Sequence, residues 1–194
     1  MGTSPFSPKG TDFFGEDQRD PLKEALQACG QFGPQQTAGR FYPMACVSLE
    51  VTQRCNLDCT LCYLSERAEM AHDVPLDILF DRIEMVARHY GAGTSIQISG
   101  GDPTLRPLPD LVAICAKIRA MGMRSCLMTN GILANREMLR TLSRAGLDDV
   151  AFHVDLTQGR TGFPSEEALN SVRGAYIDRA KGLGLRILFN TTVF

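Results

Sequence analysis

From Ala45 onward, short apolar runs alternate with longer stretches in which apolar residues recur every three or four positions. The short runs are typical of buried β-strands, and the longer stretches are typical of amphipathic helices. Five strands are predicted in chain order: Val47–Val51, Ser95–Ser99, Arg124–Thr129, Asp149–Asp155 and Leu185–Val193. The helices between them are predicted to begin at Pro75, Leu108, Asn135 and Ser165, and to end near Tyr90, Met121, Ala145 and Gly182.

Strands that alternate with helices predict an α/β fold with a parallel sheet and right-handed crossovers. Residues 1–44 differ, because they are rich in Gly, Pro, Gln and charge and contain one short helical candidate, Pro21–Cys29. We therefore expect an N-terminal extension at 1–44, loosely ordered or packed on the core, and a core domain at 45–194.

The composition is that of an ordinary globular protein, with 44% apolar and 22% charged residues and a net charge of −2. This balance gives no electrostatic argument for nucleic-acid or membrane binding. No apolar run approaches the ~18 residues of a membrane span, and the first residues lack the apolar core of a secretory signal. We expect a cytoplasmic protein.

Three of the seven cysteines, Cys55, Cys59 and Cys62, follow the first predicted strand with the spacing Cys-x3-Cys-x2-Cys. Iron–sulfur clusters take thiolate ligands at several spacings, and soft sulfur suits iron. A four-iron cluster held by three cysteines leaves one iron open to a small molecule. The three cysteines are therefore the predicted ligands of a [4Fe-4S] cluster.

Two other uses of cysteine are open to this chain. A zinc site would need a fourth donor, which Cys29, Cys46 or His72 could supply. A disulfide framework fits poorly with an odd number of cysteines and no secretory signal. Cys115 and Cys126 fall on a helical core face and in a strand, so we predict that they are buried as small apolar residues.

The cysteine spacing, followed downstream by Gly100-Gly101-Asp102-Pro103, resembles the radical S-adenosylmethionine (radical SAM) superfamily. The likeness runs from about Ala45 to the end of the sequence. The chain departs from the family at Asp102, where Glu is usual, and at Leu61, where many members have an aromatic residue, whereas here Tyr63 follows the third cysteine. That pattern is closer to a group that includes archaeal tetraether lipid synthase and pterin methyltransferase-like proteins.

The resemblance implies a partial (β/α) TIM-like barrel of parallel strands. The family core has six units and this chain shows about five, so we expect it to be truncated. It also implies that the cluster reductively cleaves S-adenosylmethionine to a 5′-deoxyadenosyl radical, which abstracts hydrogen from an unidentified substrate. The implied partners are a small-molecule or lipid substrate and an electron donor such as flavodoxin or ferredoxin.

By the same resemblance, the strand end at Gly100 and Gly101 binds the methionine amino group, with Asp102 at the position of the family's Glu. Glycines also let the backbone approach a ligand closely. Polar residues near other strand ends form the rest of the expected S-adenosylmethionine site, together with the aromatic Tyr63: Asn130, His153, Asp155 and Asn190. For His153 and Asp155, which share one face of their strand, ligand contact and a structural hydrogen bond are both open.

Two alternatives to this general function remain. A narrower enzyme class is a radical methylase or carbon–carbon coupling enzyme that acts on lipid or pterin. The other alternative is a non-catalytic iron–sulfur or zinc binding module. The glycine pair and the repeated β/α units count against such a module, which would need neither.

Overall fold

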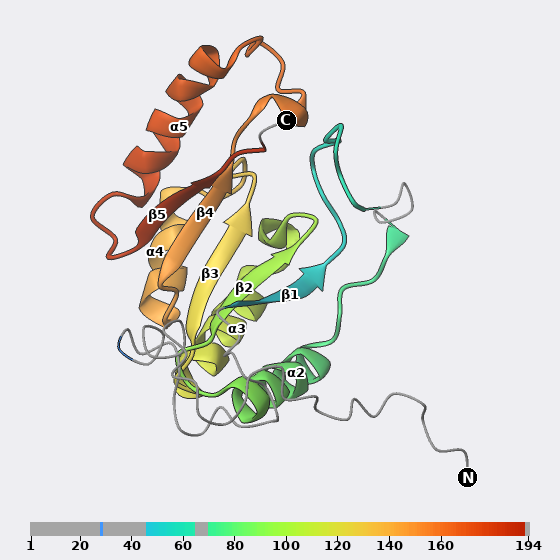
Figure 1. Ribbon diagram of the computed structural model, residues 1–194, viewed down its shortest axis with the longest axis vertical. Coiled ribbons are helices and arrows are strands. Elements are labelled where there is room, and N and C mark those ends of the chain that lie inside the picture. Colours follow the sequence, from blue (N-terminus) through green and yellow to red (C-terminus); the bar gives the residue numbers. More distant parts are fainter. Residues whose placement is uncertain (1–27, 29–45, 65–69, 193–194) are drawn as a thin grey trace, which may run out of the picture.

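The structure is a computed structural model that describes residues 28, 46–64 and 70–192 (Figure 1). Five strands form one sheet in the order β1-β2-β3-β4-β5, and every neighbouring pair is parallel. Their bounds are β1 Cys46–Thr52, β2 Ser95–Gly100, β3 Arg124–Thr129, β4 Asp149–His153 and β5 Arg186–Asn190. The predicted α/β class and parallel sheet are confirmed.

The helices between the strands form one layer against the sheet (Figure 1). Their bounds are α2 Leu76–Tyr90, α3 Leu108–Ala120, α4 Arg136–Ala145 and α5 Glu166–Ala180, and two 3-10 turns, η2 Pro103–Leu105 and η3 Leu156–Gln158, follow β2 and β4. Because strand order equals chain order, right-handed crossovers place all four helices on the same face. The sheet is therefore part of a barrel wall, with β1 and β5 as its edges among the described residues.

Alternation along the strands separates a packed face from a polar one. On β2, Ile96 and Ile98 are buried in the core that the helices share, whereas Gln97 and Ser99 point to the opposite face. On β1, Leu49 and Val51 likewise belong to the core. The polar face is thus left available for a ligand.

Local signals explain most element boundaries. The side chains of Asn135 and Ser165 accept hydrogen bonds from backbone N–H groups in the first turns of α4 and α5, as N-caps do. Pro75 lies at the N-cap of α2 rather than inside it. The strand β4 ends at His153, earlier than predicted, because Asp155 leaves the strand direction to cap η3. The strand β5 ends at Asn190, also earlier than predicted.

The predicted extension 1–44 lies outside the described residues, apart from Ala28. Cys29 and Val193 lie outside them as well. Among the residues described, no helix is both long enough and apolar enough to cross a membrane.

Candidate functional site

A cavity of about 280 Å³ opens at the carboxyl ends of the strands, where barrels of this type carry their sites. The lining includes most of the residues predicted for the cluster and for S-adenosylmethionine: Cys55, Cys59, Cys62, Tyr63, Gly100, Gly101, Asn130, His153 and Asn190. Asp102 and Asp155 do not line it. Ser48, Gln97, Ser99 and Met128, from the open face of the sheet, extend the wall beyond the predicted set.

The three predicted ligands lie on the segment Gln53–Leu64, which we call the cysteine loop. Their thiols are free, with Cys55 and Cys59 half-buried and Cys62 exposed. In the part of the chain that the structure describes, no three His, Cys, Asp or Glu side chains come together as ligands of one metal ion. Three thiols around a shared cavity fit a cluster instead, because the irons of a cluster occupy separate corners.

Electrostatic repulsion among the thiols of the cysteine loop affects their pKa values. Burial, followed by repulsion from Cys55 and Cys62, raises the pKa of the Cys59 thiol to about 11. Burial also raises the pKa of Cys55. A positively charged centre among the three sulfurs would offset both effects, because metal coordination deprotonates thiols.

The remaining described cysteines lie elsewhere. Cys115 and Cys126 are buried in the molecule, as predicted. Cys46 begins β1 whereas the cysteine loop follows the end of β1, so the strand separates them by about 20 Å. His72 is exposed and does not line the cavity. The zinc alternative therefore has no fourth donor among these residues.

The glycine pair allows the chain to approach itself closely. A Cβ at Gly100 would lie 1.8 Å from the carbonyl oxygen of Thr52, and one at Gly101 would lie 2.1 Å from that of Arg54. Gly100 also has a φ of +135°, which side chains rarely adopt. The pair thus seats the start of the cysteine loop on the end of β2, a role that its sequence alone did not indicate.

Partly buried polar contacts hold the start of the cysteine loop. The Arg54 guanidinium pairs with the Asp73 carboxylate at 2.7 Å, and the Thr52 hydroxyl donates to the same carboxylate. Burial opposes ionisation of Asp73, but hydrogen bonds from Arg54 and Thr52 outweigh it and lower the pKa of Asp73. Arg106, almost fully buried, donates to the carbonyl oxygen of Val51.

Asp102 is fully buried behind the cavity, with 0% exposure. Its carboxylate accepts from the backbone N–H and hydroxyl of Thr104, from the Thr129 hydroxyl, and from the backbone N–H of Asn130 at 2.8 Å. These donors occupy both of its oxygens. The geometry therefore favours a structural use of this carboxylate over the direct cofactor contact that the resemblance implies.

Asp155, 1% exposed, repeats this arrangement after β4. It accepts from the backbone N–H and hydroxyl of Thr157 and from the backbone N–H of Thr192, and it lies 2.8 Å from Nε2 of His153. Burial alone would raise the pKa of this carboxyl, but those hydrogen bonds hold it well below its usual range. His153 is 38% exposed and lines the cavity, so it stands between Asp155 and any ligand.

Sequence reasoning missed the partners of these two aspartates. Thr104 and Thr157 belong to a repeated Asp-x-Thr pattern that the printed sequence contains at both strand ends. Arg160 was also missed; its guanidinium donates to the backbone oxygen of Asn130 and to the Tyr176 hydroxyl, tying the end of β3 to α5. Nothing in the spacing of Arg160 marks this role.

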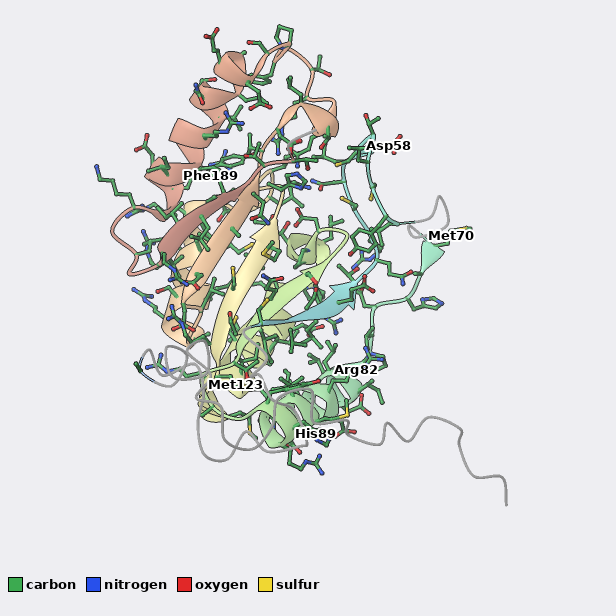
Figure 2. All side chains as sticks on the ribbon, viewed as in Figure 1. Asp58, Met70, Arg82, His89, Met123 and Phe189 are labelled. Atoms are coloured by element: carbon green, nitrogen blue, oxygen red, sulfur yellow. The ribbon has the colours of Figure 1, made fainter. Side chains whose placement is uncertain are left out.

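A larger cavity, of about 450 Å³, lies at the opposite end of the sheet. Three arginines and two aspartates contribute to its lining, and Asp149 pairs there with Arg124 and Arg186. In Figure 2, Met123 marks this end, and Asp58 marks the tip of the cysteine loop at the other. The larger cavity contains none of the cysteine-loop thiols, so it is not the candidate cofactor site.

Three curated relatives are 31% to 36% identical to this chain in the aligned parts. Fe-coproporphyrin III synthase of Methanosarcina barkeri is 31% identical over 69% of the chain. GTP 3′,8-cyclase of Chlorobaculum tepidum is 36% identical over 61%, and 7,8-dihydro-6-hydroxymethylpterin dimethyltransferase of Methanocaldococcus jannaschii is 31% identical over 56%. The chain spans 31%, 35% and 22% of those proteins respectively.

Solved structures share the fold at lower identity. The protein anSMEcpe, solved with bound AdoMet and the Cp18Cys peptide, matches 77% of this chain and 42% of its own, with a TM-score of 0.57 at 19% identity. SuiB of Streptococcus suis, bound to precursor peptide SuiA, matches 92% of this chain and 40% of its own, with a TM-score of 0.59 at 14% identity. These likenesses support the partial-barrel fold.

A family model described as the Radical SAM superfamily matches residues 49–192. That range begins inside β1, contains the cysteine loop and runs past β5, so it covers the sheet except for the first three residues of β1, and it holds the thiols of the cavity. The family uses a [4Fe-4S] cluster and S-adenosylmethionine, which agrees with three thiols beside a polar cavity. The chain belongs to the radical S-adenosylmethionine superfamily.

Proposed function

We propose that this chain is the core of a radical SAM enzyme in which Cys55, Cys59 and Cys62 hold three irons of a [4Fe-4S] cluster. The observation that carries the proposal is the cavity that these thiols share with the polar ends of β2 to β5. When bound, the cluster supplies the electron for reductive cleavage of S-adenosylmethionine. The substrate would then lose a hydrogen atom inside the same cavity.

Residues that line the cavity would bind S-adenosylmethionine. Gly101 and Gly100 offer backbone groups for the methionine end of S-adenosylmethionine, while Asn130, His153 and Asn190 present polar side chains along the cavity wall. Tyr63 closes one side, and its hydroxyl donates to Glu50 and to the carbonyl oxygen of Gly100.

The substrate class is not given by the relatives. By their names, one relative makes Fe-coproporphyrin III and the other two act on GTP and on a pterin, so they favour no single substrate. A methylase or coupling enzyme for lipid or pterin is a narrower candidate, supported by Leu61 before the third cysteine and by the pterin dimethyltransferase relative. An electron donor such as flavodoxin or ferredoxin, and a reducing cytoplasmic location, complete the proposal.

The test is anaerobic reconstitution followed by iron and sulfide analysis. We expect about four irons and four sulfides per chain, and loss of the cluster in Cys55→Ala, Cys59→Ala and Cys62→Ala. Cys115→Ala is the matched control, because Cys115 is buried among apolar residues far from the cavity lining. If Cys115→Ala lost the cluster while one of the three variants kept it, the ligand assignment would be wrong.

A second measurement separates an enzyme from a binding module. S-adenosylmethionine should change the electron paramagnetic resonance spectrum of the reduced cluster, because it would coordinate the open iron. An unchanged spectrum in a fully reconstituted sample would favour the non-catalytic module. Gly101→Ala is unsuitable here, since its Cβ would collide with the Arg54 backbone and disturb the cysteine loop itself.

A further inference from the structure

The residue that directly follows each cysteine of the loop makes a hydrogen bond to a different strand or turn of the core. Asn56 follows Cys55, Thr60 follows Cys59, and Tyr63 follows Cys62. We propose that these three residues are anchoring contacts that set the positions of the cysteine thiols, and that Asp102 and Asp155 are positioning residues behind two of them. This inference rests on the proposed function, since it assigns the thiols to a cluster.

The first anchoring contact joins the loop to the end of β3. Nδ2 of Asn130 donates to Oδ1 of Asn56 at 2.7 Å. Asn130 cannot move freely, because its backbone N–H donates to Asp102 and its own Oδ1 accepts from the backbone N–H of Ile132. The position of Cys55 therefore depends, through Asn56 and Asn130, on a buried carboxylate.

The second anchoring contact joins the loop to η3, beyond β4. The backbone N–H of Thr60 donates to the carbonyl oxygen of Thr157 at 2.8 Å. Thr157 is in turn held by Asp155, which accepts from both its backbone N–H and its hydroxyl. Asp155 thus stands behind Cys59 as Asp102 stands behind Cys55.

The third anchoring contact joins the loop to β1 and β2. The hydroxyl of Tyr63 lies 3.0 Å from Oε1 of Glu50 and 3.2 Å from the carbonyl oxygen of Gly100. The residue is 72% exposed, so its hydroxyl contacts and not its burial decide where it lies. Among the residues that the structure describes, no buried aspartate supports this contact, so it differs from the other two.

Three separate contacts matter because a cluster requires its thiolates at fixed mutual distances. A loop already held in that shape loses less conformational entropy when it binds, and so binds more tightly. Asp58, at the loop tip in Figure 2, is exposed and makes no hydrogen bond that the described structure shows. It provides a control inside the same loop.

The experiment compares Asn56→Ala, Asn56→Asp and Tyr63→Phe with Asp58→Ala in the full chain. Asn56→Asp keeps an oxygen that can accept from Asn130, so it should restore what Asn56→Ala loses. Losing one net hydrogen bond should raise the equilibrium constant for local opening of the loop roughly 3- to 10-fold. We expect Asn56→Ala to increase alkylation of the half-buried Cys55 by that factor in the cluster-free protein. Cys62 is exposed with or without its contact, so we expect Tyr63→Phe to act instead as faster iron loss to a chelator from the reconstituted protein.

Asp155→Ala tests the positioning role by hydrogen exchange, because it removes the oxygen that accepts from Thr157. In the cluster-free wild type the Thr60 amide should exchange slowly, and Asp155→Ala should accelerate it about 3- to 10-fold while the first contact stays unchanged. In reconstituted protein, Asn56→Ala should lose iron faster to a chelator and alter the spectrum of the reduced cluster, whereas Asn56→Asp and Asp58→Ala should match the wild type.

The outcomes separate this inference from the proposed function. If the wild type takes up no iron and sulfide, the proposed function fails, whatever the exchange data show. If it assembles a full cluster but Thr60 exchanges as an unprotected amide and the Asn56 and Tyr63 variants behave like Asp58→Ala, the anchoring contacts are wrong. Should Asp155→Ala fail to fold, the variants of the exposed Asn56 and Tyr63 decide alone.

Discussion

Two turns at the carboxyl ends of alternate strands have the same local design and different surroundings. Asp102-Pro103-Thr104 follows β2 and Asp155-Leu156-Thr157 follows β4, and in each the aspartate caps a 3-10 turn through the threonine N–H at 2.9 Å. The second carboxylate oxygen then accepts a backbone N–H from the end of the next strand, at Asn130 or at Thr192. Each aspartate therefore joins two neighbouring strand ends.

The difference lies in the remaining partner. The carboxylate of Asp102 accepts one more hydrogen bond from the buried Thr129 hydroxyl, whereas the carboxylate of Asp155 contacts the partly exposed ring of His153. The carboxylate of the first turn has only buried partners, whereas the carboxylate of the second turn contacts the His153 ring, which lines the cavity. The same local motif is thus closed off from the cavity in one place and in contact with a cavity-lining side chain in the other.

The largest effect is expected from replacing the sealed carboxylate. Asp102→Asn should lower the free energy of unfolding by about 3 kcal/mol, because its amide would oppose the buried N–H of Asn130 and leave that donor unsatisfied. Asp155→Asn should cost only about 1–2 kcal/mol, because Thr192 is exposed and water can satisfy its N–H, while the neutral His153 ring can accept from the new amide. Urea unfolding followed by circular dichroism measures both; equal losses would remove the distinction between the turns.

The next effect should appear in ligand binding and not in stability. His153→Ala should weaken S-adenosylmethionine binding to the reconstituted protein about 10-fold, a cost of about 1.4 kcal/mol, because a ring that lines the cavity is lost. The melting temperature should change by less than about 3 °C, because the ring is half-exposed and Asp155 keeps three other donors. Titration calorimetry tests this, and an unchanged affinity would make His153 a structural residue only.

The smallest effect tests what the two turns have in common. Thr104→Val and Thr157→Val each remove one hydroxyl donor and keep the volume, so each should cost about 1 kcal/mol. The two costs should agree within about 0.5 kcal/mol, since the local geometries match. Urea midpoints at constant slope are the measurement, and a clear inequality would show that the surroundings, not the turn, set the strength.

Much of the fold could be predicted from the sequence because it depends on local signals. The hydrophobic runs placed all five strands within a few residues, and Asn135 and Ser165 marked helix starts by residue type alone. The cysteine loop was also evident, since its spacing is contained in eight consecutive residues.

What could not be predicted depends on partners distant in the chain. The glycine pair was expected to face a ligand, yet its close neighbours are Thr52 and Arg54, almost 50 residues earlier. Asp102 was expected at the cofactor, yet its partners come from the end of a strand that pattern analysis cannot align with it. Periodicity gives the face on which a residue lies and not the strand end that it meets.

The contact between Asn56 and Asn130 joins residues that are 74 positions apart. On a ribosome that adds roughly 5–20 residues per second, the cysteines are made about 4–15 s before the strand end that fixes the first of them. During synthesis the three thiols are therefore present without their support, open to oxidants and to competing metal ions. We therefore expect cluster insertion to follow the emergence of β4 and η3 from the ribosome. Oxygen should damage the cysteine thiols of the nascent chain more than those of the folded chain.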